Sequence, residues 1–253
     1  MRIATIVTSM HNTDNLIIRD VPTTSTIVQF DDHSMAIIDT GMAGNPELLE
    51  QLGEMGFQPS DFSLVINTHL HPDHIGGNRL FTKARIMISQ RELEYHRYLN
   101  QLMLQCNNPE ALLKSDSRPH LSARPLLFRN LKELAERYPV LELVGYPEQL
   151  TFLEDNHEPP KNIGFISVPG HSIDDHAVVL NGHTTKALIA GDALFHRDLW
   201  RQQTIPFINF SEDMFRRSAN QITRFPGIII PGHDNAFDNT NGKYMELNKF
   251  ILL

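Results

Sequence analysis

The sequence predicts a layered α/β fold whose functional residues gather at one edge of its β-structure. Short apolar runs rich in β-branched residues alternate with segments whose apolar residues recur at helical spacing. Several of these runs are followed by an acid or a histidine, as residues 35–38 are by Asp39 and residues 62–66, after two polar residues, by His69. Because α/β sheets bind ligands at the carboxyl ends of their strands, we expect these side chains to lie close together.

The first half of the chain predicts strands that lead up to a histidine-rich loop. Five strands are expected there, over residues 3–7, 25–30, 35–38, 62–66 and 84–88. The polar turn at 31–34 makes the second and third strands a β-hairpin. Residues 45–55 predict an amphipathic helix, with Pro46 near its start and Gly56 directly after its end.

A helical pattern then interrupts the strands. Apolar residues recur at helical spacing from Tyr95 to Cys106 and again from Leu127 to Tyr138, which predicts two amphipathic helices. We interpret residues of about 90–140 as a helical insert over one edge of the sheet. Cys106 falls on the apolar face, which favours a place in the core over a role as ligand or nucleophile. The role of His96 in this insert stays open.

Strand patterns return in the last third of the chain. Four strands are expected, over residues 164–168, 177–180, 186–190 and 227–230. Asn181-Gly182 is typical of a hairpin turn between the second and third of these. Residues 212–223 predict a helix, and residues 244–253 a short closing helix.

Composition narrows the class of protein. The 253 residues, 41% hydrophobic and 21% charged, are enough to bury a full core. A formal net charge of −8 argues against a general attraction to nucleic acid or anionic membranes. A single cysteine excludes an intrachain disulfide and favours a reducing cytoplasm. No signal peptide or membrane-spanning run is visible, so we expect a cytoplasmic protein.

The most informative stretch is the loop from Thr68 to His74, which places three histidines and a carboxylate within six positions. Imidazole and carboxylate groups suit Zn²⁺ and similar metals. The spacing is not that of one helix face, and Pro72 disfavours a continuous helix. An extended segment that turns into a helix would point His69 and His71 one way and Asp73 and His74 another. One loop could then serve two metals, whereas the alternative is a polar surface loop.

Matching residues follow strands later in the chain. Two apolar runs end in Pro-Gly-His, at His171 and His233, and another ends in Gly-Asp at Asp192. Each pairs a flexible turn with a potential ligand at the same sheet edge. The candidate metal ligands are therefore His69, His71, Asp73, His74, His171, Asp192 and His233.

This ordered set resembles the five motifs of the metallo-β-lactamase superfamily. The matching positions are Asp39, the loop His69–His74, His171, Asp192 and His233, and the match covers nearly the whole chain apart from the insert. The resemblance implies an αββα sandwich with a helical insert, in a single domain over residues 1–253. It also implies two divalent metal ions, with zinc the first choice and iron or manganese as alternatives.

The resemblance further implies a role for each residue. Metal 1 would be held by His69, His71 and His171, metal 2 by Asp73, His74 and His233, with Asp192 as the bridge. A metal-bridging hydroxide would attack the substrate, with Asp73 as the catalytic residue that orients it or takes its proton. Asp39 would orient a ligand histidine, the alternative being a simple turn residue.

We expect hydrolysis of a small ester, lactone or thioester. Lactonases of the family have a similar length, although Phe195 stands where they typically carry a tyrosine. One alternative is a phosphodiesterase or nuclease, in which His196 and Arg197 could contact an anionic substrate. Another is a mononuclear iron persulfide dioxygenase, against which the retained metal 2 ligands argue.

The expected partner is a small-molecule substrate, with no membrane partner; nucleic acid is disfavoured, and a homodimer stays open. Because loops over a rigid scaffold usually set specificity, we expect the insert to wall the substrate pocket. The candidate lining residues are Tyr95, Tyr98, Leu102 and Phe128. The alternative is a structural cap or a dimer contact.

Overall fold

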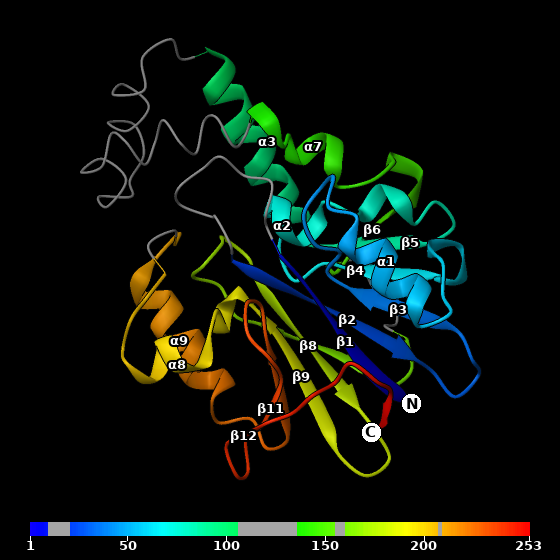
Figure 1. Ribbon diagram of the computed structural model, residues 1–253. Coiled ribbons are helices and arrows are strands. Elements are labelled where there is room, and N and C mark those ends of the chain that lie inside the picture. The colour runs from blue at the N-terminus through cyan, green and yellow to red at the C-terminus, as the bar shows by residue number, and fades with distance from the viewer. Residues whose placement is uncertain (10–20, 106–135, 155–159, 207–208) are drawn as a thin grey trace.

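Two β-sheets lie against each other in the computed structural model, and helices cover their outer faces (Figure 1). The structure describes residues 1–9, 21–105, 136–154, 160–206 and 209–253. Seven strands form the first sheet, and six form the second. This αββα order is the one that the resemblance implied, so the predicted fold class is confirmed.

The first sheet contains most of the first half of the chain. Its strands are β1 (Arg2–Ser9), β2 (Pro22–Gln29), β3 (Met35–Ile38), β4 (Leu64–Ile66), β5 (Arg85–Ile88), β6 (Leu150–Phe152) and β13 (Ile251–Leu252), in the order β13-β1-β2-β3-β4-β5-β6. Neighbours from β13 to β3 are antiparallel, and neighbours from β3 to β6 are parallel. The predicted strands and the hairpin at 31–34 are confirmed.

The second sheet contains the later strands. They are β7 (Ile163–Ser167), β8 (His176–Asn181), β9 (Lys186–Gly191), β10 (Ile228–Pro231), β11 (Phe237–Asp238) and β12 (Lys243–Tyr244), in the order β12-β11-β10-β9-β8-β7. The predicted hairpin at Asn181-Gly182 joins β8 to β9. Only β9 and β10 run parallel, so both carboxyl ends, which precede Asp192 and His233, lie at one edge of this sheet.

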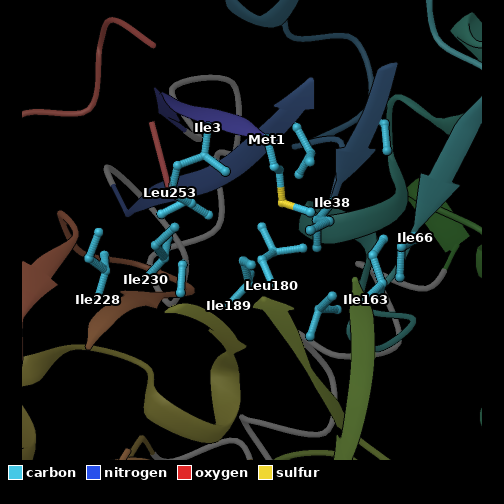
Figure 2. Packing of buried hydrophobic residues seen from close by; sticks show 14 of the residues in the cluster. Met1, Ile3, Ile38, Ile66, Ile163, Leu180, Ile189, Ile228, Ile230 and Leu253 are labelled. Carbon is cyan, nitrogen blue, oxygen red and sulfur yellow. The ribbon is translucent and has the colours of Figure 1, made fainter. Parts of the chain in front are cut away.

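The hydrophobic core lies between the two sheets. Figure 2 shows Ile38 and Ile66 of the first sheet facing Leu180 and Ile189 of the second. Neighbouring residues in a strand point to opposite faces, so Ile37 belongs instead to a cluster on the outer face of the first sheet. Burial on both faces explains why the central strands read as continuous apolar runs.

Helices close the two outer faces. They are α1 (Glu47–Glu54), α2 (Pro72–Ile75), α3 (Gln90–Gln105), α7 (Val140–Leu143), α8 (Arg197–Arg201) and α9 (Glu212–Ile222). Short 3₁₀ turns occupy Pro59–Asp61, Asn78–Leu80, Pro147–Gln149 and Asp192–Leu194. In Figure 1, α1 and α2 lie over the first sheet and α8 and α9 beside the second. Among the described residues, no helix has the length and apolarity needed to cross a bilayer.

The predicted closing helix at 244–253 is wrong. The segment runs extended and ends in β13, which pairs antiparallel with the edge strand β1. Leu247 and Leu253 are buried in the core between the sheets. Pairing with an open strand edge, together with burial of these leucines, satisfies the backbone and the apolar side chains better than an exposed helix would.

The helical insert is partly described. Its first predicted helix is α3, which extends away from the sheets in Figure 1. The second predicted helix lies mostly outside the described residues, as do Cys106 and Phe128. The side chain of Leu102 is likewise outside them. The insert is followed by α7 and by β6, a three-residue edge strand that the sequence pattern did not predict.

Candidate metal centre

All seven candidate ligands meet where strands of both sheets end. The loop after β4 carries four of them, and residues after β7, β9 and β10 carry the other three. Their ligand atoms form two groups, each within 4.8 Å: His69, His71, His171 and Asp192, and Asp73, His74 and His233. These groups have the composition that the resemblance implied for metals 1 and 2. Below they are called the first and the second group.

The loop after β4 changes conformation at the proline. His71 is extended, with φ −72° and ψ 147°, and Pro72 opens α2. Proline suits this first helical position because it has no N–H to donate and its φ is already helical. The predicted change from extended to helical backbone is confirmed. As a result, His69 and His71 join the first group, and Asp73 joins the second.

Asp192 connects the two groups. Its Oδ1 lies 3.2 Å from Nε2 of His74, and its Oδ2 lies 3.1 Å from Nε2 of both His171 and His233. The space for this carboxylate depends on Gly232, where an added Cβ would lie 2.1 Å from Oδ1 of Asp192. The glycine of the second Pro-Gly-His turn is therefore required by its close packing against Asp192.

In His74 and His233, the Nδ1 nitrogen has a partner of its own. Nδ1 of His74 lies 2.8 Å from Oδ2 of Asp39, and Asp39 also accepts hydrogen bonds from the main chain and the hydroxyl of Thr68. Nδ1 of His233 faces the main-chain carbonyl of Pro22. Such contacts fix the ring orientation and the tautomer of a metal-binding histidine. The predicted contact between Asp39 and a ligand histidine is confirmed.

Two inward-facing nitrogens are left without a hydrogen bond among the described residues. They are Nε2 of His69 and Nε2 of His74, both buried. A buried polar atom normally has a partner, so these two nitrogens indicate a ligand between the rings. Five imidazoles and two carboxylates are a donor set that fits Zn²⁺, Fe²⁺ or Mn²⁺, so the residues fit the implied metals.

The charge states of His69, His71 and Asp192 suit metal binding, whereas His74 must first lose a proton. Burial, reinforced by neighbouring imidazoles, lowers the pKa of His69 and His71 well below the usual value, which keeps both rings neutral. Burial alone would raise the pKa of Asp192, but nearby imidazoles, led by His233, hold it well below its usual range. Burial would lower the pKa of His74, but carboxylates, led by that of Asp192, raise it well above the usual value.

The loop after Asp192 is occupied with internal contacts. The ring of Phe195 stacks on that of His233, with centroids 4.1 Å apart. Arg197 is buried, and its guanidinium carbon lies 3.4 Å from the ring centroid of Tyr244. It also donates a 2.7 Å hydrogen bond to a main-chain carbonyl. This arrangement counts against the predicted contact of Arg197 with an anionic substrate, whereas His196 is more exposed.

Sequence reasoning missed two buried carboxylates beside the first group. Glu92 on α3 is fully buried, and Asp175 approaches Nδ1 of His69 at 4.0 Å. A signal for Glu92 was present, because it lies on the same helical face as Tyr95 and Leu99, where a charged residue is out of place. His96, left undecided by the sequence, has its ring centroid 6.4 Å from that of His71.

Comparison with known proteins agrees with this site. The sequence model described as the metallo-beta-lactamase superfamily matches residues 18–233. An N-acyl homoserine lactonase of Bacillus thuringiensis is 21% identical over 198 residues, which cover 76% of this chain and 64% of the lactonase. Metallo-beta-lactamase domain-containing protein 1 of Xenopus laevis is 24% identical over 208 residues, covering 79% and 66%. The match therefore spans less than two thirds of these relatives.

Solved structures share the fold. AidC, described as a dizinc quorum-quenching lactonase, has a TM-score of 0.63 at 20% identity, covering 85% of this chain and 73% of AidC. A putative metallo-beta-lactamase of Thermotoga maritima has a TM-score of 0.56 at 16% identity, covering 94% and 100%. The residues matched by the family model include all seven candidate ligands. The chain belongs to the metallo-β-lactamase superfamily.

Proposed function

We propose that this chain is a hydrolase that uses two divalent metal ions to cleave a small ester, lactone or thioester. The observation that carries the proposal is the pair of ligand groups joined by one carboxylate, Asp192. A single metal would need only the first group. The second group is equally complete, with three residues and a carboxylate shared with its neighbour, which supports a dinuclear site.

Each residue has a proposed task. His69, His71 and His171 would hold one ion, Asp73, His74 and His233 the other, and Asp192 both. When bound, the ions would supply Lewis-acid activation of the substrate and lower the pKa of an attacking water toward ~7. The side chain of Asp73 is 17% exposed, with Oδ2 3.5 Å from Nε2 of His233. It can therefore both bind metal and accept a proton from water at the open side.

The substrate class draws on the relatives and on the loop after Asp192. Several relatives are N-acyl homoserine lactonases, which supports a lactone or a similar ester. The internal contacts of Arg197 weaken the phosphodiesterase alternative, because they occupy a side chain that was expected to contact an anionic substrate beside the metals. The complete second group weakens the mononuclear dioxygenase alternative. Zinc is the metal we propose first, since imidazole-rich sites suit it well.

Elemental analysis and a substrate panel test the proposal together. The purified chain should bind about two metal ions, and it should hydrolyse lactones or thioesters faster than phosphodiesters. A chain that holds one iron tightly and gains no second ion on reconstitution would contradict the dinuclear hydrolase. Activity confined to phosphodiesters would keep the dinuclear site but overturn the substrate class.

A further inference from the structure

A buried carboxylate lies at the start of the insert helix, next to the first group of ligands. Glu92 is 0% exposed, in the first turn of α3. Burying a charge is costly unless hydrogen bonds compensate. Its Oε1 accepts from the hydroxyl of Ser172 and, at 2.8 Å, from the main-chain N–H of Asp174. Its Oε2 accepts from the main-chain N–H of Leu70 at 3.4 Å.

These three donors belong to the two loops that deliver the first group. Leu70 stands between His69 and His71 in the loop after β4, and Ser172 directly follows His171 in the loop after β7. One loop follows a strand of the first sheet, and the other follows a strand of the second. A single carboxylate therefore holds the main chain beside all three histidines of the first group.

The rings of these histidines depend on the spacing between the loops. Nδ1 of His71 lies 2.9 Å from Nε2 of His171, and the ring centroids of His69 and His71 lie 4.5 Å apart. A small shift of either loop would separate ligand atoms that must reach one ion. Asp175 supports the same loop from the other side, since it accepts from the main-chain N–H of Ser172 at 2.6 Å.

The contacts of Glu92 differ from those of an ordinary helix cap. The first turn of α3 already has acceptors: Glu154 accepts from the N–H of Gln90 at 3.1 and 3.0 Å, and the hydroxyl of Ser89 accepts from the N–H of Glu92 at 3.2 Å. The side chain of Glu92 instead reaches the two ligand loops. Its position on α3 connects the helical insert to the metal centre.

We infer that Glu92 is a positioning residue of the first metal site, which sets the spacing of His69, His71 and His171 and ties that spacing to α3. The inference rests on the metal centre proposed above. It concerns the geometry of the ligands, since Glu92 contacts the loops rather than any ligand atom. Residues that hold metal ligands in place without binding the metal typically contribute 10–100-fold to metal affinity.

Glu92→Gln tests the inference, with Glu154→Gln as the matched control at the same helix end. The amide keeps the acceptor for Ser172 and Asp174 but turns an NH₂ group toward the N–H of Leu70. Each substitution is made in the full chain and again with Asp73→Ala, which weakens the second site so that binding reports on the first. Chelator competition gives the affinity for Zn²⁺, and the visible absorption of bound Co²⁺ reports the ligand geometry.

We expect Glu92→Gln to weaken the first site about 10–100-fold and to change its Co²⁺ spectrum. Glu154→Gln should leave both unchanged. Ser172→Ala removes one donor to Glu92, so it should shift affinity in the same direction, and the double variant should lose less than the sum of the two. The metal-free variants should melt within a few degrees of the parent.

Three outcomes would overturn the inference. If the parent chain binds two ions and Glu92→Gln leaves the affinity of the first site unchanged, the inference is overturned and the proposed function stands. Equal weakening of both sites together with a large loss of stability in the metal-free chain would also overturn the inference, because that pattern marks a purely structural residue. A parent chain that binds no metal would overturn the proposed function and this inference together.

Discussion

Two buried imidazoles of the centre, His74 and His233, use their two nitrogens for different tasks. In His74, Nδ1 meets Asp39 and Nε2 faces Asp192, and in His233, Nδ1 meets a main-chain carbonyl and Nε2 again faces Asp192. The outer contact therefore decides which nitrogen is free to bind a metal. Residues with no place in the ligand set consequently control its chemistry.

Removing the shared carboxylate should disable both sites at once. Asp192 lies against ligands of both groups, so Asp192→Ala should lose both metals and the hydrolytic activity. Elemental analysis and turnover on the substrate panel measure the two losses. Asp198→Ala, at a more exposed carboxylate on α8, is the control and should change neither. Two retained metals with near-normal turnover would show that the ligand assignment is wrong.

Metal binding should release protons at neutral pH. The carboxylates around His74 raise its pKa well above the usual value despite burial, so the ring is protonated in the metal-free chain. A ligand imidazole must be neutral, so metal affinity should fall as the pH drops below this raised pKa. Calorimetric titration with Zn²⁺ in buffers of different ionisation enthalpy counts the released protons.

Asp39→Asn provides the comparison for that count. The substitution removes one of the charges that raise the pKa of His74, together with its charge-assisted contact. Fewer protons should be released at neutral pH, and affinity at the second site should fall about 10–100-fold. An unchanged proton count would mean that the charge of Asp39 does not hold the proton on His74.

At the scale of elements, the start of α3 is fixed by a carboxylate from a distant part of the chain. Glu154, beyond β6, accepts hydrogen bonds from the N–H groups of Gln90 and, at 3.5 Å, Arg91. A negative side chain at a helix N-terminus satisfies free N–H groups and interacts favourably with the helix dipole. This contact links the edge strand to the insert helix.

Glu154→Ala should therefore destabilise the chain by about 1 kcal/mol, a melting-temperature loss of roughly 2–4 °C. Burial would raise the pKa of Glu154, but the hydrogen bonds from Gln90 and its neighbours outweigh it and lower the pKa. A lowered pKa means that the stabilisation is present above the unfolded-state value, near 4.5, and is lost as the pH falls through the folded-state value. Calorimetry at pH 7 and pH 4 measures both effects. The control Glu54→Ala, at an exposed residue on α1, should leave the melting temperature unchanged at either pH.

We propose that the described part of the insert takes part in substrate choice. His96, on the first turns of α3, lies beside the ring of His71 from the loop after β4. The ring of Tyr95 packs edge-on against that of Phe210, with centroids 5.8 Å apart. Tyr98 is 52% exposed on the same helix. Ligand pockets are lined largely by apolar and aromatic side chains, so an exposed aromatic ring of this kind can contact an apolar substrate chain.

Tyr98→Ala should change the relative kcat/KM values among lactones of different chain length at unchanged metal content. Tyr146→Ala, at another exposed aromatic residue packed against Arg79, is the control and should leave the ranking as it is. Altered stability or oligomeric state with an unchanged ranking would favour the structural-cap alternative.

At the scale of the whole molecule, the sequence predicted the fold and the site most accurately where functional residues lie close to strands with a clear apolar pattern. The central strands were visible because they are buried on both faces, and the ligands because they lie in short segments that follow β4, β7, β9 and β10. The strands β6 and β11 to β13 have two or three residues, too few for a periodic pattern, and form because a partner strand is open. Glu92 and Asp175 were missed because their roles depend on contacts between distant segments, such as that of Glu92 with Ser172 and that of Asp175 with His69.

Metal removal should affect the stability of the entire fold. A ligand that binds only the native state stabilises it by about 2.7 kcal/mol at 100 times its Kd. The melting temperature should therefore rise with free Zn²⁺ and fall on chelation, as differential scanning calorimetry would show. The Asp192→Ala variant should melt at the same temperature with or without Zn²⁺. A melting temperature independent of Zn²⁺ in the parent would contradict a native-state metal site.

The division of the ligands between the two sheets gives the centre a mechanical consequence. His71 and His171 lie 100 residues apart in sequence, yet they belong to one group, so an ion bound there would cross-link the two halves of the sandwich. Closing so long a loop removes much entropy from the unfolded chain, as a disulfide does in secreted proteins. A chain with one cysteine cannot form an intrachain disulfide. The cross-link made by the metal would be reversible, so the rigidity of the sandwich would depend on the concentration of free metal ions.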